Sequence, residues 1–316
     1  MRWPTSGLPN SLPAFPPSKT EVNTASLGLM VLVNLAWALN TIVSKLAVGP
    51  LGAPPLFYAG ARGVIVAVVL LPLLRPLPAG VGKVMLVGLA ISGGSFALLY
   101  MGLITATPSA AAIVALSGAP LTVLFVILLL GERVGWRRAL GIALTFGGVL
   151  LTMTGRGGLA MSAGLWLVFG SALVGAVGSV FVKRLEVDSF RLQAWASVAS
   201  VAFLMPLSLA LEPSPLPAIT AAPWQLAGCL LFAALVVSIG AHGTYYGLLQ
   251  RHDANVLVPL TLLNPLFTVA LGAWLTDDPV GPRLLIGGVV AMAGVAIILV
   301  RPSATVPKPA LTAPKD

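Results

Sequence analysis

The chain has 316 residues, of which 58% are hydrophobic and 9% charged, and its mean hydropathy is +1.00. A soluble protein carries about 25% charged residues, so most of the surface of this chain must face lipid. The formal net charge of +9 would suggest nucleic-acid binding in a soluble protein. In a membrane protein, basic residues first report orientation, and we expect no nucleic-acid partner. The composition indicates a polytopic membrane protein.

The sequence lacks the residues that several kinds of chemistry require. Cys229 is the only cysteine, and His242 and His252 are too far apart to form a metal-binding pair on one helix turn. The glycine-rich phosphate loop and the common hydrolase motifs are also missing from the sequence. We therefore expect no metal, no cofactor, no direct use of ATP and no enzyme activity.

Apolar runs of about 20 residues predict membrane-spanning helices. In chain order, we expect ten helices, at about 27–46, 56–74, 84–103, 110–130, 138–155, 163–182, 192–211, 224–249, 254–275 and 284–300. The flanking segments 1–26 and 302–316 are rich in proline and polar residues, which predicts disordered tails. The expected fold is an all-α membrane protein.

Two sequence matches indicate an internal repeat. Tyr100-Met101-Gly102-Leu103 matches Tyr245-Tyr246-Gly247-Leu248 at an offset of 145 residues, and Pro120 matches Pro265 at the same offset. These matches predict two five-helix repeats, over residues 27–155 and 156–301. Because five is an odd number, the second repeat should enter the membrane from the opposite side, which makes the pair inverted.

The basic residues predict the orientation. With a cytoplasmic N-terminus, 14 of the 18 lysines and arginines lie at inner ends of the expected helices or in the tails, and four lie at or toward the outer side. Cytoplasmic segments are enriched in lysine and arginine. We therefore expect a multi-pass protein of the cell (inner) membrane with both termini in the cytoplasm.

Short motifs in the first half resemble a known family. The first span carries Trp37-Ala38-Leu39-Asn40-Thr41-Ile42-Val43-Ser44-Lys45, the second carries Arg62, and Pro120 in the fourth is followed by Gly131-Glu132-Arg133. This pattern is similar to that of the drug/metabolite transporter superfamily, in its EamA-type branch. The second half departs from the pattern, because Thr276-Asp277-Asp278 stands where many members repeat Gly-Glu and Ala196 stands at the place of a second arginine.

The resemblance implies a secondary transporter. Members move small metabolites, amino acids or drugs, and one bacterial branch resembles aromatic amino acid exporters. The short motifs imply the architecture more strongly than the substrate.

Polar residues on the first span form one candidate part of the substrate site. Trp37, Asn40, Thr41 and Lys45 lie on or beside one helix face, and polar groups in a membrane helix must face protein or water. The alternative is that they pack against other helices, and that Lys45 extends to the membrane interface.

Arg62 is the second candidate, because it lies about six residues inside its span. With no carboxylate in nearby spans, its expected partners are backbone carbonyls, water or an anionic group of the substrate.

Further candidates lie in the third, eighth and ninth spans. They are Tyr100, His242, Tyr245 and Asn264, which we predict to bind substrate together with the residues of the first two spans. For His242 the alternative is a neutral side chain that hydrogen-bonds between helices. Glu132 belongs either to a network of loop residues or to a gate.

Pro120 and Pro265 are predicted to interrupt their helices and to mark the site at the repeat interface. The alternative is that these two prolines kink their helices only to allow packing.

The expected function is alternating-access transport of amino acids, including aromatic ones, or of related small metabolites, with export favoured by the resemblance. The interiors of the expected spans contain no aspartate or glutamate, whereas carriers of cations commonly use an intramembrane carboxylate. A substrate with a carboxylate or other anionic group is therefore favoured.

Alternatives are a drug or other metabolite carrier of the same fold, a channel, and a membrane enzyme or scramblase. The partners are the small-molecule substrate and the lipid bilayer. The coupling ion and the oligomeric state stay open, and a monomer is compatible with the sequence.

Overall fold

A computed structural model describes residues 23–130, 135–154, 163–182, 184–252 and 254–300. The described residues form helices and connecting turns, with no strand among them. The predicted tails and Gly131-Glu132-Arg133 lie outside these residues, apart from residues 23–26, where the first helix already begins.

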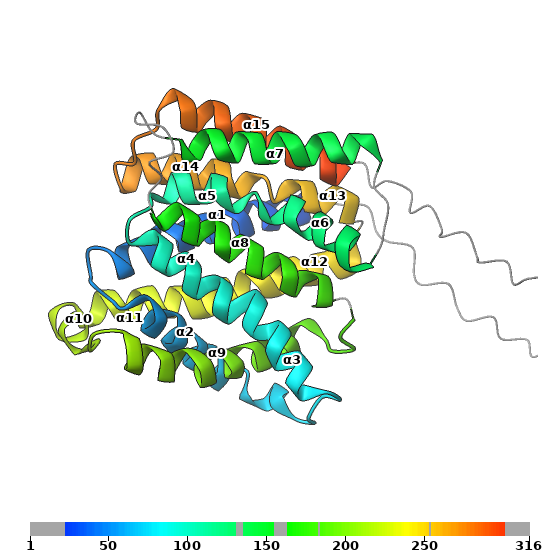
Figure 1. Ribbon diagram of the computed structural model, residues 1–316. Helices are drawn as coiled ribbons and strands as arrows, with labels where there is room; N and C mark the ends of the chain where they lie inside the picture. Colours follow the sequence, from blue (N-terminus) through cyan, green and yellow to red (C-terminus); the bar gives the residue numbers. More distant parts are fainter. Residues whose placement is uncertain (1–22, 131–134, 155–162, 183, 253, 301–316) are drawn as a thin grey trace, which may run out of the picture.

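The helices follow one another along the chain as a single bundle (Figure 1). Their bounds are α1 Thr24–Val48, α2 Pro55–Val69, η1 Leu71–Leu74, α3 Val81–Gly88, η2 Leu89–Gly94, α4 Ser95–Leu103, α5 Pro108–Ala115, α6 Gly118–Leu130, α7 Trp136–Met153, α8 Ala163–Val182, α9 Ser189–Leu211, α10 Leu216–Ala221, α11 Pro223–Leu231, η3 Phe232–Ala241, α12 His242–Arg251, α13 Ala254–Leu260, α14 Leu263–Leu275 and α15 Pro282–Val300.

In the described part of the chain, a helix or a series of consecutive helices lies at each of the ten predicted positions. Eight helical stretches are long and apolar enough to cross a membrane, and α2 is a shorter apolar helix of 15 residues. The sequence prediction is wrong in extending the second span to residue 74, because Pro72 lacks the N–H that would continue the helix and η1 follows instead. The count of ten spans and the inversion of the halves stay predictions.

The predicted helix interruptions are present. Helix α5 is separated from α6 by Leu116 and Ser117, and α13 from α14 by Thr261 and Leu262. Pro120 lies four residues after Leu116, and Pro265 lies four residues after Thr261. Because proline has no N–H, neither can donate the usual helical hydrogen bond to the carbonyl four residues earlier. The two interruptions therefore occupy matching places in the two halves of the chain.

Two other spans contain π-helical segments that the sequence analysis did not predict. The segment η2 joins α3 to α4, and η3 joins α11 to α12, so that both lie within otherwise continuous helices. A π-helical segment is rare and is frequent at functional sites. The third and eighth spans are thus irregular at matching places.

Helices α7 and α15 lie side by side along one edge of the bundle (Figure 1). A Cβ atom on Gly141 would approach the carbonyl of Gly294, and one on Gly148 would overlap the backbone at Gly287. Gly141, early in α7, faces Gly294, late in α15, so the two helices are antiparallel. The glycines allow their backbones to approach closely.

Polar contacts join helix ends at the end of the bundle where α1 finishes, here called the far end. The Glu212 carboxylate accepts hydrogen bonds from the backbone N–H groups of Leu56 at 2.8 Å and Phe57 at 2.9 Å. The Asp278 carboxylate accepts from the N–H of Ser109 at 2.8 Å. Glu212 and Asp278, both from the second half, therefore each cap a helix of the first half, where the helix dipole favours negative charge.

Lys45 belongs to the same far end. Its Nζ atom donates to the carbonyls of Leu103 at 2.7 Å and Ile104 at 3.1 Å. A cation favours the C-terminus of a helix, so Lys45 links the end of α1 to the end of α4.

The Glu212→Ala variant should be less stable than the wild type by about 1 kcal/mol, because the first turn of α2 loses its capping carboxylate. The apparent Tm in detergent should fall by about 2–4 °C. Glu186→Ala, at an exposed glutamate, is the matched control. An unchanged Tm for Glu212→Ala would contradict the capping role.

Candidate functional site

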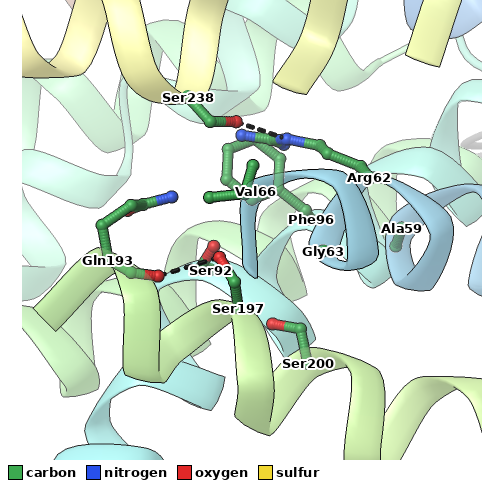
Figure 2. Close-up of a pocket in the computed structure, with 10 residues that line it drawn as sticks. All are labelled: Ala59, Arg62, Gly63, Val66, Ser92, Phe96, Gln193, Ser197, Ser200 and Ser238. Atoms are coloured by element: carbon green, nitrogen blue, oxygen red, sulfur yellow. Dashed lines mark hydrogen bonds between the residues drawn. The ribbon is translucent and has the colours of Figure 1, made fainter. Parts of the chain in front are cut away.

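Arg62 is buried in the bundle, with only 4% of its surface exposed. It is the eighth residue of α2, about 10 Å along the helix from its start. Its Nε atom donates to Ser238 Oγ and its Nη1 atom to Tyr100 OH, both at 2.8 Å. The guanidinium carbon lies 3.8 Å from the ring centroid of Phe96 (Figure 2).

The sequence analysis named backbone carbonyls, water or a substrate anion as partners of Arg62, and the water and the anion stay predictions. The observed protein partners are two hydroxyl groups and an aromatic ring. A ring face attracts a cation, more strongly where water is excluded. The hydroxyls and the ring leave the positive charge of Arg62 without an ion pair in the described part of the chain.

The Nη2 atom of Arg62 has no hydrogen-bond partner among the described residues. A guanidinium has five N–H donors in a fixed fork that fits a carboxylate. A buried donor without a partner costs free energy. Arg62 is therefore held in place on one side and has hydrogen-bonding capacity left for a ligand.

Ser238 owes its position to the π-helical segment η3. Its Oγ atom donates to the carbonyl of Ala233, five residues earlier, at 2.8 Å, and accepts from Arg62. Further along, His242 Nδ1 lies 2.8 Å from the carbonyl of Val237, again five residues earlier. Since a carbonyl can only accept, Nδ1 carries the proton of this bond.

Tyr100 is fully buried in α4. Its ring lies edge-on to Tyr58, with centroids 5.0 Å apart, and against Phe96 at 5.8 Å. The Tyr58 hydroxyl donates to the carbonyl of Cys229 at 3.2 Å. These packed rings fix the phenol that accepts from Arg62.

A cavity of about 490 Å³ lies beside Arg62. Its lining includes polar, aromatic and aliphatic side chains, namely Arg62, Ile91, Ser92, Phe96, Ser179, Val182, Ser189, Leu192, Gln193, His242, Tyr245, Tyr246 and Leu249. A smaller hollow adjoins it, where Ser92, Gln193, Ser197 and Ser200 lie below the guanidinium (Figure 2). The volume of the larger cavity is that of a small-molecule site.

The cavity extends toward the end of the bundle where α1 begins, here called the start end. Val182 is the last residue of α8 and Ser189 the first of α9, and both line the cavity. His252, which directly follows the end of α12, lies with its Nε2 atom 2.9 Å from Ser26 Oγ in the first turn of α1. The end of α12 and the beginning of α1 are therefore at the same end of the bundle. The cavity therefore lies between Arg62 and the start end, whereas the capping contacts lie at the far end.

An aromatic cluster of Trp37, His242, Tyr245 and Tyr246 lies on the α1–α12 side of the cavity. The Trp37 ring centroid is 5.3 Å from those of His242 and Tyr245, and Tyr245 is 5.6 Å from Tyr246. The indole N–H of Trp37 has no partner among the described residues. The cluster can pack against an apolar or aromatic part of a ligand.

On the other side of Trp37 lies a second hollow of about 260 Å³. Leu116, Thr261, Leu262 and Pro265 also line it, so both helix interruptions lie at its wall. Asn264 lines this hollow, and its Oδ1 atom accepts from Thr268 at 3.2 Å.

The structure brings together only part of the predicted site. Arg62, His242 and Tyr245 line the main cavity, while Tyr100 and Trp37 lie directly behind this lining. Asn264 and Pro265 line the second hollow.

Other predicted residues lie apart from the main cavity. Lys45 bonds carbonyls at the far end, and Thr41 Oγ1 donates within α1 to the Trp37 carbonyl at 3.4 Å. Asn40 is buried, with no partner for its Oδ1 among the described residues. Pro120 lies in the first turn of α6, and Glu132 is outside the described residues.

Sequence reasoning missed Phe96, Ser92 and Gln193, which line the main cavity. Phe96 looks like any other apolar residue of its span, and only the fold places it under a guanidinium. Gln193 carried a usable signal, because it is a polar residue one turn into an apolar helix.

The fold and the cavity define a multi-pass membrane protein with a site for a small molecule. The described residues contain no group of three or more histidine, cysteine or acidic side chains that could hold a metal ion.

The EamA-like transporter family model matches residues 24–154 and again residues 162–300. The chain thus belongs to the EamA-like transporter family, as the sequence motifs predicted, and is a membrane transporter with a small-molecule substrate.

Two curated relatives are similar over most of their length. A "Probable amino-acid metabolite efflux pump" of Escherichia coli (strain K12) is 28% identical over 279 residues, covering 85% of this chain and 93% of the relative. A protein described in the same words from Salmonella typhimurium (strain LT2) is 29% identical with the same coverage. A solved crystal structure superposes with a TM-score of 0.58 at 19% identity, over 87% of this chain and 96% of that one. This last likeness concerns the fold alone.

The Tyr100→Phe variant should be destabilised by about 1.5–3 kcal/mol, because it removes the acceptor of a charged donor and leaves Nη1 buried without its partner. Tyr58→Phe, which removes a bond between neutral groups, should cost about 1 kcal/mol. Apparent Tm values of the two variants in the same detergent test this order. Equal effects would contradict the role of Tyr100 in holding Arg62.

Proposed function

We propose that the chain is a secondary transporter that exports amino acids, including aromatic ones, or related metabolites with a carboxylate, across the inner membrane. The observation that carries the proposal is Arg62, a buried guanidinium beside a cavity of about 490 Å³, with one nitrogen that has no hydrogen-bond partner among the described residues. The substrate carboxylate bonds Nη2, and the rest of the substrate lies toward Tyr245 and Tyr246. The description of the two curated relatives supports export of amino-acid metabolites.

The direction of access follows from the proposed orientation. If the start end is cytoplasmic, as the basic residues predict, the cavity faces the cytoplasm. The contacts of Glu212, Asp278 and Lys45 then close the periplasmic side. A cavity that reaches the cytoplasm is where an exporter loads its substrate.

Alternating access then requires the two halves to move relative to one another. Antiparallel α7 and α15, the matching helix interruptions and the matching π-helical segments all support an inverted pair of repeats. The far-end contacts of Glu212 and Asp278 would break when the cavity opens to the periplasm.

Counterflow in proteoliposomes tests the carrier mechanism. Vesicles loaded with an unlabelled amino acid should accumulate the same labelled amino acid transiently, and a panel of the twenty standard amino acids identifies the substrate. A carrier shows stimulation by substrate on the opposite side, because a loaded site returns faster than an empty one. High flux without such stimulation would contradict the proposal and favour a channel.

Arg62→Ala should weaken substrate binding about 10- to 100-fold, since a hydrogen bond to a charged group is worth about 1.5–3 kcal/mol. Arg62→Lys should retain part of the affinity, because the charge stays but the planar fork is lost. Concentration dependence of counterflow gives both values. Arg75→Gln, at an exposed arginine outside the cavity, is the control. Wild-type affinity in both Arg62 variants would contradict the site.

A further inference from the structure

The outer surface of the bundle is hollowed between α3–η2 and α8. A groove of about 570 Å³ is lined there by Lys83, Leu86, Val87, Ala90, Val177, Gly178, Phe181, Arg184 and Leu185. The groove is separate from the cavity beside Arg62, since none of the described residues lines both.

Its two walls have the same order of side chains. On α3 and η2, Lys83 is followed by Leu86, Val87 and Ala90, which are one and two helix turns further along. On the α8 side, Arg184 lies just past the helix end, and Phe181 and Val177 lie one and two turns before it. Residues at this spacing share one face of a helix.

The cations of both walls therefore lie at the same end of the groove. Lys83 is the third residue of α3, and Arg184 follows the end of α8, so both lie near the start end of the bundle. Both side chains are exposed. From Lys83 and Arg184, the apolar lining of each wall extends for seven residues, which is about 10 Å into the membrane.

The apolar part of the groove faces lipid. Leu86 is 69% exposed, which in a membrane protein of this composition means contact with acyl chains. The walls meet at the bottom of the groove, where a Cβ on Gly178 would come within 3.0 Å of Ala90 Cβ. The groove is thus open to the bilayer on one side and closed on the other.

We propose that the groove binds an anionic phospholipid of the start-end leaflet. One acyl chain lies along Leu86, Val87 and Val177, and the phosphate lies between Lys83 and Arg184. Among the residues that the structure describes, no carboxylate lines the groove, so its positive charge favours a lipid with net negative charge over a zwitterionic one. Basic side chains at a membrane surface attract anionic lipids.

The bound lipid would act on transport through α8 and η2. On α8, Val177 and Phe181 line the groove while Ser179 and Val182 line the substrate cavity. In the same way Ala90 lines the groove, and the next residue, Ile91, lines the cavity. A lipid in the groove therefore supports the wall that keeps the cavity open at the start end.

Native mass spectrometry of the delipidated protein tests the proposal. Phosphatidylglycerol and phosphatidylcholine with identical acyl chains are added in equal amounts, and the bound lipids are counted. The wild type should retain at least one phosphatidylglycerol in preference to phosphatidylcholine. Equal retention of both lipids by the wild type would overturn the proposal.

Two sets of variants separate the charge from the groove. The double variant Lys83→Gln with Arg184→Gln should lose about 30-fold in affinity for phosphatidylglycerol, or about 2 kcal/mol for two cations. Val177→Trp keeps both cations but fills the groove, and should lose the lipid as well. Arg137→Gln, at an exposed arginine outside the groove, should bind like the wild type. An undiminished preference in the double variant or in Val177→Trp would also overturn the proposal.

Discussion

The buried charge of Arg62 is the constraint on which the rest of this structure depends. A guanidinium inside a membrane protein needs compensation, and here Ser238 from η3 and both Tyr100 and Phe96 from α4 provide it. Each of these partners needs its own support. Ser238 is fixed by the π-helical segment η3, and Tyr100 by the packed ring of Tyr58. The irregular helix and the aromatic packing are thus arranged around one cation.

The two ends of the bundle are built differently. At the far end, Glu212, Asp278 and Lys45 bond the termini of helices from other parts of the chain. Toward the start end, the cavity separates the ends of α8, α9 and α12, and its lining there includes Val182, Ser189 and Leu249. Charged caps thus hold one end together while the other contains space for a solute. In a carrier this difference corresponds to one of two access states.

Much of this fold could be predicted from the sequence, and less of the site. Apolar runs located the helices, and the Pro120 and Pro265 pair located both interruptions, because a missing N–H acts locally. Burial of Arg62 was also predictable from its depth in a span. The π-helical segments were not, since no local residue pattern specifies them. Lys45 illustrates the remaining difficulty, because the same side chain can contact a substrate or cap a helix, and only the position of α4 decides between them.

Binding of a substrate and of its carboxamide tests the role of Arg62 most directly. The amino acid that counterflow identifies and its amide differ in one charge, and both are compared on the wild type and on Arg62→Ala. The wild type should bind the acid at least about tenfold more tightly than the amide, and this difference should disappear in Arg62→Ala. The same preference for the acid in both proteins would contradict the proposal that Arg62 holds the carboxylate.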